Sequence, residues 1–358
     1  MSGGGIAVIV SGFPRRSETF ALGELLALAE RGALARVFAT KPGEDGGLQP
    51  GCERLLERVE FLPQGGAAEQ AAAVVERLAG KRVNGVHGYF AHAPAEVAAR
   101  AAARLGVRYG FSVHARDARK VAPDELARRA RAAACVVACN ADVARELSRT
   151  GARVQLVPHG VDLRRFRPRP VPSTKPLRLL AVGRLVEKKG FHFLVAAAAR
   201  LKFPFSLRIV GCGPERERLS ALIDSHGLRE RVTLCGARTH EELPEEYARA
   251  HAVVAPSVQD RTGDRDGLPN VVLEAMASAR PVVAGDAGAI SSAVTHGETG
   301  LLVPPGDTAA LADALELLAH EPDLRERLGR GARARVERDY EVGRCTERLH
   351  RLLEKVYA

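Results

Sequence analysis

One segment in the second half of the chain combines acidic side chains with the turn residues that precede a helix. Gly267 and Pro269 interrupt the chain just before a helix that we expect to begin near Asn270. Free backbone N–H groups at such a helix start, together with the positive end of the helix dipole, suit a phosphate group. Asp266 on the loop and Glu274 in the first turns would then flank the anion and accept hydrogen bonds from sugar hydroxyls. An ordinary helix start with solvated acids is the alternative.

The same segment offers two metal-binding patterns, and neither persuades. Asp264 and Asp266 form an Asp-x-Asp motif, but a match of this length is common by chance. A calcium-binding EF-hand fails because its first and last ligand positions would hold Thr262 and Leu273. We therefore expect no metal here.

Two further turns carry groups suited to a diphosphate. Arg184 and Lys189 lie in the sequence VGRLVEKKG, between a predicted strand and its helix, where phosphate sites occur in nucleotide-binding folds. Arginine would form a forked contact with the phosphates and lysine would act as a point charge. A basic surface loop is the alternative. Gly211 and Gly213 form a tight strand-to-helix turn, which lacks the third glycine of a dinucleotide fingerprint.

Histidines in the first half lie near the ends of predicted strands. His114 directly follows one strand, and His87 and His92 flank the end of another. A single histidine is more often structural than catalytic, but strand-end positions that face one cleft favour a functional role. We interpret His159, in the sequence PHGVD, as part of a structural turn that closes the first domain.

Short β-branched runs alternate with helical segments along the whole chain, which is typical of α/β folds with parallel sheets. In the first half we expect strands at residues 6–10, 34–39, 59–62, 85–88, 109–113, 135–138 and 154–157, and helices at 19–31, 67–78, 94–105 and 140–149. In the second half we expect strands at 177–182, 206–210, 232–235, 252–255, 281–284 and 301–303, helices at 190–201 and 215–226, and mostly helix from 308 onward.

Four prolines within residues 168–176 separate the two halves. Such a stretch cannot extend a helix or lie in the middle of a sheet. We therefore predict an N-terminal Rossmann-like domain over 1–168, a linker over 169–176, a C-terminal Rossmann-like domain over 177–336, and a last helix over 337–358 that packs back on the N-terminal domain. Two such halves place the binding site in the cleft between them, at the C-terminal edges of the strands.

The composition is that of a globular chain with two domains. The 358 residues are 46% hydrophobic and 27% charged, and no run approaches the ~18–20 apolar residues of a membrane span. The start of the chain lacks the basic segment of a signal peptide. Six scattered cysteines are expected to be reduced thiols in a cytosolic protein. These features exclude a secreted disulfide scaffold, a transmembrane protein and a disordered chain.

The net charge of +10 is concentrated in residues 1–170, which hold 26 Lys and Arg against 17 Asp and Glu. A basic half attracts polyanions such as nucleic acid, an anionic membrane surface or a phosphorylated substrate, and a solvated arginine-rich surface is the alternative. Aromatic residues do not interleave with the arginines, which argues against a nucleic-acid partner.

Taken together, the motifs resemble those of retaining glycosyltransferases of family four (group one), which have the GT-B fold. The resemblance rests on VGRLVEKKG, GDRDGLPNVVLEAMASARPVVAGDAGAISSAV and GETGLLVPPGD, and on SGFPRRSETF, FSVHARD, CNADVARELSR and VPHGVDLRRFRP. It spans nearly the full chain and is nearest to the exopolysaccharide and colanic-acid branch. It implies an α/β architecture of two Rossmann-like parallel-sheet domains that face an interdomain cleft.

The resemblance also implies roles for individual residues. Asp266 would contact the donor sugar, Glu274 the nucleotide ribose, and His114 would stand at the sugar end of the donor. Residues that would hold the diphosphate, or let it approach, are Arg184, Lys189, Gly12, Gly211, Gly213, Gly267, Leu268, Asn270 and Val271. Two departures concern the sugar and the acceptor: the first acid is commonly Glu, and Tyr89 stands where related chains often have a second histidine.

The implied reaction transfers a hexose-type sugar, with retention, from a UDP- or GDP-linked donor to a hydroxyl of a glycan, lipid-linked or small-molecule acceptor. No metal or other cofactor is expected. The expected location is the cytoplasm, with peripheral contact to the anionic inner face of the membrane. A GT-B epimerase, a phosphorylase and a non-catalytic partner of an active transferase are the alternatives.

Overall fold

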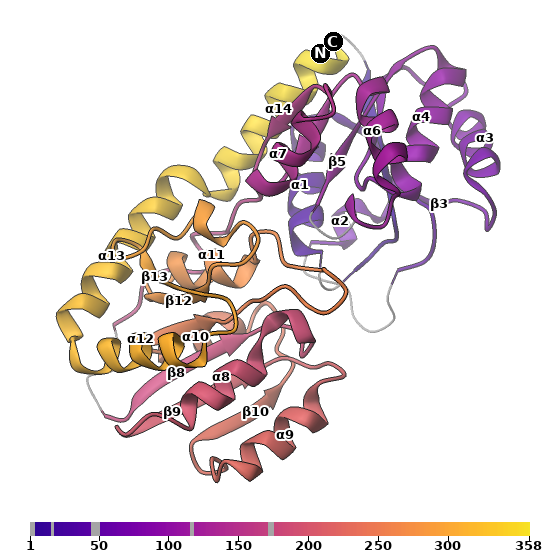
Figure 1. Ribbon diagram of the computed structural model, residues 1–358. Coiled ribbons are helices and arrows are strands. Elements are labelled where there is room, and N and C mark those ends of the chain that lie inside the picture. The colour runs from indigo at the N-terminus through magenta and orange to yellow at the C-terminus, as the bar shows by residue number, and fades with distance from the viewer. Residues whose placement is uncertain (1–3, 16–17, 44–50, 115–117, 171–174) are drawn as a thin grey trace. The chain divides into compact units, whose positions relative to one another are not determined.

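The computed structural model describes residues 4–15, 18–43, 51–114, 118–170 and 175–358 (Figure 1). Contacts within the chain divide it into two compact units. Unit 1 comprises Met1–Gly160 and Gly343–Ala358, and unit 2 comprises Val161–Val342. The last segment of chain therefore belongs with the N-terminal part.

The division falls earlier than the predicted linker over 169–176, of which residues 171–174 lie outside the described part of the chain. The physical reason lies in the residues just after Gly160. Val161 pairs with Glu341 in an isolated parallel bridge, and the side chain of Phe166 is buried in the core of unit 2. These contacts draw the segment before the prolines into unit 2.

A parallel sheet forms the centre of unit 1, and its described strands run in the order β3-β2-β1-β4-β5-β6-β7. The strands are β1 (Gly5–Val10), β2 (Leu34–Ala39), β3 (Val59–Phe61), β4 (Val83–Gly88), β5 (Arg108–Val113), β6 (Val136–Ala138) and β7 (Val154–Leu156). Successive side chains of a strand point to opposite faces. Ile6, Val8 and Val10 accordingly enter one core and Ala7 and Ile9 another.

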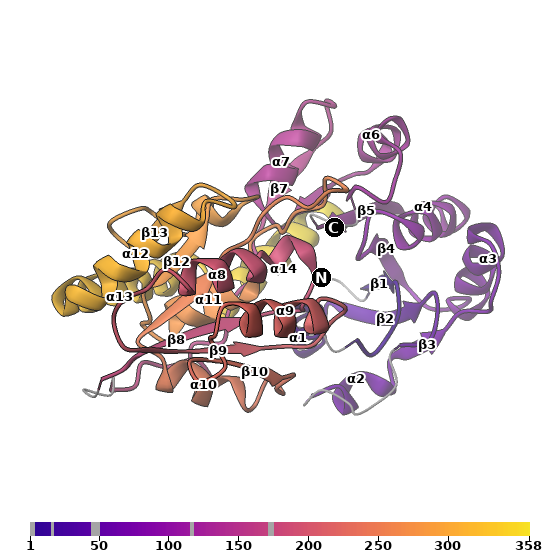
Figure 2. The same ribbon diagram turned by 60° about the horizontal axis from the view of Figure 1, so that its bottom comes forward.

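Helices cover both faces of this sheet (Figures 1 and 2). Helices α1 (Thr19–Glu30) and α14 (Val342–Tyr357) pack on the face that includes Ile6 and Val8. The opposite face packs against α3 (Ala67–Arg77), α4 (Ala93–Leu105), α6 (Pro123–Ala132) and α7 (Ala141–Ser148). The short helix α2 (Glu53–Leu56) contributes Leu55 to the first of these cores.

Unit 2 has a second parallel sheet, with the strand order β10-β9-β8-β11-β12-β13 among its described residues. The strands are β8 (Leu177–Val182), β9 (Phe205–Val210), β10 (Val232–Gly236), β11 (Ala252–Ala255), β12 (Val282–Gly285) and β13 (Gly300–Val303). One face packs against α8 (Phe191–Ala198), α9 (Arg216–Ser225) and α12 (Thr308–His320). The other packs against α10 (Leu243–Arg249), α11 (Asn270–Ala277) and α13 (Pro322–Asp339).

The predicted fold class is confirmed: each unit is a Rossmann-like parallel sheet with helices on both faces. In each sheet the strand order reverses beside the first strand, between β1 and β4 in unit 1 and between β8 and β11 in unit 2. In open α/β sheets, ligands bind outside the C-terminal ends of the strands at this switch point. The loops that follow these strands are therefore the places to look for chemistry.

Candidate functional site

The predicted phosphate-binding residues of unit 2 lie on the two loops at the switch point of its sheet. Arg184 and Lys189 follow β8, and Asp266 and the start of α11 follow β11. Gly190 lets the two loops touch, because a Cβ there would lie 1.9 Å from the carbonyl oxygen of Pro256. Its φ of 66° also lies in the left-handed region that favours glycine.

The turn after β9 joins the same loop edge. A Cβ on Gly211 would lie 1.8 Å from the carbonyl oxygen of Gly183, and one on Gly213 would lie 2.4 Å from that of Leu185. Both glycines therefore hold the turn against the loop of Arg184. In the structure these two glycines support the loop of Arg184. They lie at the predicted edge of the sheet.

A buried cluster of lysines and carboxylates forms the centre of this edge. Lys189 Nζ lies 2.8 Å from Asp266 Oδ2, and Lys188 Nζ lies 3.5 Å from Asp266 Oδ1. Lys188 Nζ also lies 3.0 Å from Asp264 Oδ2, and Ser257 Oγ donates to Asp266 Oδ2 at 3.2 Å. Lys188, whose side chain is 7% exposed, was not singled out from the sequence.

Electrostatics keeps this cluster charged. Burial alone would raise the pKa of Asp266, but the ammonium groups of Lys189 and Lys188 outweigh it and hold that pKa below its usual value. Asp266 is thus an ionised carboxylate that keeps two ammonium groups at the switch point. A phosphate arriving here would find Lys189 already in place and would compete with Asp266 for it.

Arg184 differs from the lysines in being exposed at the end of β8. The methylene chain of Lys189 passes beside Gly183, the residue before Arg184. A Cβ on Gly183 would lie 3.4 Å from Cδ and Cε of Lys189. The guanidinium and the ammonium groups thus belong to one loop, in which Arg184 is exposed, Lys189 half-buried and Lys188 buried.

The segment before α11 presents backbone groups at the same edge. Helix α11 begins at Asn270, and its N-cap residue, Pro269, supplies no side-chain hydrogen bond. Gly267 accepts a hydrogen bond from the backbone N–H of Ala289 at 3.3 Å, which ties the segment to the loop after β12. Leu268 packs against the core beneath the loop. The backbone N–H groups of Asn270 and Val271, in the first turn of α11, could donate hydrogen bonds to a bound anion.

Glu274 lies on α11 in a buried network that sequence reasoning did not foresee. Tyr247 Oη donates to Glu274 Oε2 at 2.7 Å, and His240 Nε2 lies 3.5 Å from Glu274 Oε1. Burial and the neighbouring carboxylate raise the pKa of Tyr247 well above its usual value, so it stays a donor. His240 follows β10 and also contacts Arg165, with 2.6 Å between Nη1 and Nδ1. The network leaves the carboxylate one strongly bound oxygen and one loosely bound oxygen.

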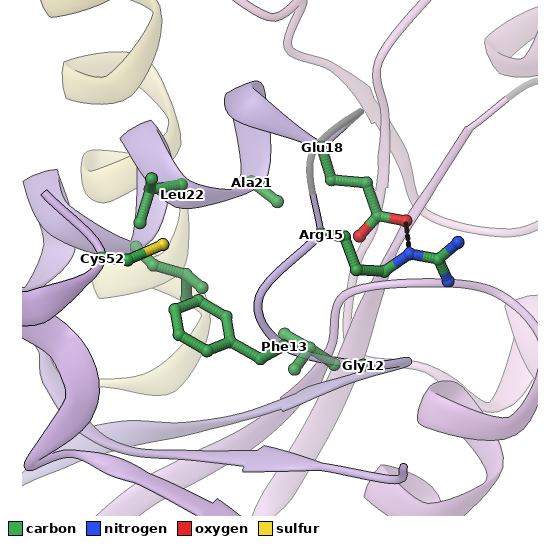
Figure 3. Close-up of a pocket in the computed structure, with 9 residues that line it drawn as sticks. Gly12, Phe13, Arg15, Glu18, Ala21, Leu22 and Cys52 are labelled. Atoms are coloured by element: carbon green, nitrogen blue, oxygen red, sulfur yellow. Dashed lines mark ion pairs between the residues drawn. The ribbon is translucent and has the colours of Figure 1, made fainter. Parts of the chain in front are cut away.

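In unit 1, Gly12 lies on the loop after β1, beside a small cavity (Figure 3). Phe13, Leu22 and Cys52 line it, and Arg15 Nε forms an ion pair with Glu18 Oε1 at 3.2 Å at its rim. The cavity measures about 10 Å³, enough for one water molecule. A Cβ on Gly12 would lie 3.0 Å from the carbonyl oxygen of Pro42, so the glycine serves close packing of this loop.

His114 follows β5 and is surrounded by rings from helix α1 and from the segments after β4 and β7. The centroid distances to Phe20, Tyr89, Phe90 and His159 are 5.2, 5.5, 4.9 and 5.0 Å. We call these five residues the ring cluster. The last three residues of the FSVHARD motif, 115–117, lie outside the described residues.

Two other histidines of unit 1 differ in role. His87 is buried, with Nδ1 2.9 Å from Tyr357 Oη and Nε2 2.9 Å from Ser112 Oγ, and burial lowers its pKa to about 4. It holds α14 to the sheet, which is a structural role. His92 stacks on Phe90 at 5.7 Å, beside the ring cluster.

His159 is the larger surprise, because its sequence context indicated a structural turn. Its Nδ1 lies 2.7 Å from Glu24 Oε1, and its ring is nearly parallel to that of His114, at 13°. Atoms of His114, Cys139 and His159 that could bind a metal lie within 4.8 Å of one another. Because Nδ1 of His159 is already hydrogen-bonded to Glu24, only Nε2 of that ring could contribute to such a set.

Comparison with known proteins supplies the family. A family model described as "Glycosyl transferases group 1" matches residues 164–335, and one described as "Glycosyltransferase Family 4" matches residues 17–165. Together the two models cover both units. The chain belongs to glycosyltransferase family four (group one).

Sequence relatives of this chain include a colanic acid biosynthesis protein and a kanosaminyltransferase. The chain is 36% identical over 201 residues to a "Putative colanic acid biosynthesis glycosyltransferase WcaL" of Escherichia coli, covering 54% of this chain and 49% of that protein. It is also 36% identical over 174 residues to an "Alpha-D-kanosaminyltransferase" of Streptomyces kanamyceticus, covering 48% and 44%. The matched stretch thus spans about half the length of these curated relatives.

Solved structures establish the GT-B fold for this chain. Anabaena HepE, solved in complex with UDP, matches with a TM-score of 0.82 at 20% identity, over 98% of this chain and 100% of that one. Sucrose-phosphate synthase from Thermosynechococcus elongatus matches with a TM-score of 0.80 at 25% identity, over 99% of each chain. Among the described residues, no helix is long and apolar enough to cross a membrane.

Proposed function

We propose that the chain is a retaining glycosyltransferase that moves a hexose-type sugar from a UDP- or GDP-linked donor to a hydroxyl acceptor in the synthesis of an exopolysaccharide or other cell-surface glycan. The observation that carries the proposal is the cluster of Lys188, Lys189 and Asp266 at the switch point of unit 2. It combines ammonium groups, an ionised carboxylate and the start of α11 at one sheet edge. Phosphate and sugar hydroxyls are the ligands that this combination suits.

In the proposed reaction, the bond between the anomeric carbon and the diphosphate oxygen breaks, and a bond to the acceptor oxygen forms on the same face. Lys189 and Arg184 stabilise the charge that develops on the diphosphate, and the departing phosphate oxygen takes the acceptor's proton. Asp266 contacts the sugar, Glu274 the ribose, and His114 the sugar end of the donor. We propose no metal in this chemistry.

A panel of UDP- and GDP-sugars tests the proposal directly. One donor should raise the melting temperature and, with an acceptor, give a product whose anomeric configuration by NMR matches the donor. Chelation with EDTA should leave the rate unchanged. Arg184→Ala should slow transfer by about 10²-fold, the typical cost of losing one charge-stabilising donor. Lack of turnover with every donor, or an inverted product, would contradict the proposal.

A second candidate, a GT-B epimerase, uses the same donors, so the acceptor separates the two. An epimerase converts the nucleotide-sugar without an acceptor, whereas a transferase releases the nucleoside diphosphate only when the sugar has moved.

Contact of the basic N-terminal half with an anionic membrane also belongs to the proposal. Its test is sedimentation with vesicles that contain or lack anionic lipid.

A further inference from the structure

The ring cluster of unit 1 rests on a buried carboxylate. Glu24 on α1 is 8% exposed, and both of its oxygens are bound: Tyr89 Oη donates to Oε2, and His159 Nδ1 lies 2.7 Å from Oε1. Burying a carboxylate is costly unless it is paired and hydrogen-bonded. A fully bonded, buried carboxylate beneath the cluster therefore fixes the position of His159 firmly.

Packing fixes the plane of the His159 ring as well. Its face stacks on Phe20 with centroids 4.2 Å apart and rings 29° from parallel, and on His114 at 5.0 Å and 13°. Phe20 and His114, whose own centroids are 5.2 Å apart, thus contact the ring from neighbouring directions, and one nitrogen is committed to Glu24. The contacts of the other ring nitrogen, Nε2, remain to be explained.

That other nitrogen is the unexplained group. Nε2 of His159 is buried and has no nitrogen or oxygen hydrogen-bond partner among the residues that the structure describes, and the sulfur of Cys139 is the polar atom near this ring. Buried polar atoms almost always have a partner, so an exception of this kind needs a reason. The reason that we consider is a ligand, because His159 lies beside His114 at the C-terminal edge of the sheet, where ligands of such folds bind.

The charge of the ring decides what partner Nε2 can take. Burial opposes protonation, but Glu24 and Cys139 together outweigh it and raise the pKa of His159 to about 10. The groups that face this ring are Glu24 on α1, Tyr89 after β4, His114 after β5 and Cys139 after β6. At neutral pH both ring nitrogens therefore carry protons, and Nε2 is a donor.

We infer that His159 is a substrate-binding residue of this glycosyltransferase, which donates a hydrogen bond from Nε2 to a hydroxyl oxygen of the sugar that lies beside His114. Glu24 is the positioning residue that orients the ring and keeps the donor protonated. The inference rests on the proposed function, because it takes from it the sugar beside His114. It assigns a role to two residues that the motif comparison left without one.

His159→Phe separates the donor from the packing, since phenylalanine keeps a ring against Phe20 and His114. We expect kcat/KM for the nucleotide-sugar to fall by about 10- to 100-fold, the range for loss of a hydrogen bond from a charged donor. The melting-temperature shift produced by UDP or GDP alone should match that of the wild type. All assays contain EDTA, so that an adventitious ion at Cys139 plays no part.

Glu24→Gln tests the protonation step without removing a ring. Loss of the carboxylate charge removes the largest of the influences that oppose burial, so the pKa of His159 should fall. The variant should then lose kcat/KM as pH rises from about 6 to about 9, over which the wild-type group stays protonated. A merely structural role for Glu24 would lower activity or stability without adding this pH dependence.

His251→Asn is the matched control. His251 is a buried histidine of unit 2 whose Nδ1 accepts from the backbone N–H of Arg178, near the N-terminal ends of β8 and β11. It should cost stability and leave kcat/KM unchanged.

Wild-type kcat/KM in His159→Phe, or a Glu24→Gln profile parallel to that of the wild type, would overturn the inference while the proposed function stands. If the wild type turns over no nucleotide-sugar at all, both fail.

Discussion

The two units share one sheet plan but solve the problem of buried charge differently. In unit 2, Asp266 is paired with Lys188 and Lys189, and Lys188 is also paired with Asp264, so two ammonium groups share two carboxylates at its centre. In unit 1, Glu24 is paired with a single histidine and a tyrosine. The first arrangement is suited to hold a diphosphate, whose charge can replace that of Asp266. The second holds one imidazole ring in place and offers a single directed donor.

The sharpest way to break this comparison is to remove a cation from unit 2. Lys189→Ala should lower kcat/KM by about 10²- to 10³-fold, because it removes a group placed for the departing diphosphate. Lys202→Ala is the control, since Lys202 is exposed and lies on the segment before β9, away from the C-terminal ends of the strands. Equal activity of the two variants would remove the lysine cluster from the site.

In unit 1, two histidines, His87 and His159, should make the free energy of unfolding depend on pH in opposite directions. Because burial lowers the pKa of His87 from 6.5 to about 4, the unfolded chain binds a proton between these values that the folded chain does not. The contribution of His87 therefore falls as pH drops from 6.5 toward 4, by roughly 2 to 3 kcal/mol. His159 has the opposite sign: its raised pKa stabilises the fold below the unfolded value and is lost as pH rises through about 10.

Urea unfolding of the wild type and of His87→Gln, at pH values above and below this window, measures the effect. The glutamine can still bond Tyr357 and Ser112 but does not titrate, so the variant should lack the His87 part of the acid slope. Parallel stability curves for the two proteins would show that His87 is protonated in the folded state.

A smaller effect is expected where unit 2 buries a neutral donor against a carboxylate. Tyr247→Phe leaves one oxygen of Glu274 without its partner and should lower the free energy of unfolding by about 1 to 3 kcal/mol. It should also raise the KM for the donor more than it changes kcat, if Glu274 binds the ribose. Guanidinium unfolding and donor kinetics check the two parts, and an unchanged KM would leave Tyr247 a purely structural residue.

Much of the fold was predictable because the strands are short, β-branched and buried. The predicted spans 34–39, 177–182 and 252–255 coincide with β2, β8 and β11. Helices α2, α6 and α10 were missed, since they are short and α6 is rich in charge. The domain boundary was misplaced because prolines mark a break in local structure, whereas packing of Phe166 decides which unit a segment joins.

The site residues likewise differ in whether local sequence or distant packing determines their positions. The positions of Arg184, Lys189 and Asp266 on the loops after β8 and β11 could be predicted from local sequence, whereas their role in binding stays a prediction. Lys188, Tyr247, Glu24 and His159 were not predictable, because each acts through a partner distant in sequence. The bond between His159 and Glu24 joins residues 135 positions apart, and no local pattern signals it.

Titration calorimetry of UDP and GDP against three proteins tests the central claim, that the lysine cluster of unit 2 holds the diphosphate. The wild type should bind one nucleotide, Lys189→Ala should bind it at least about tenfold more weakly, and His114→Ala should bind it as the wild type does. Equal affinity in the wild type and Lys189→Ala, or a loss confined to His114→Ala, would contradict the claim.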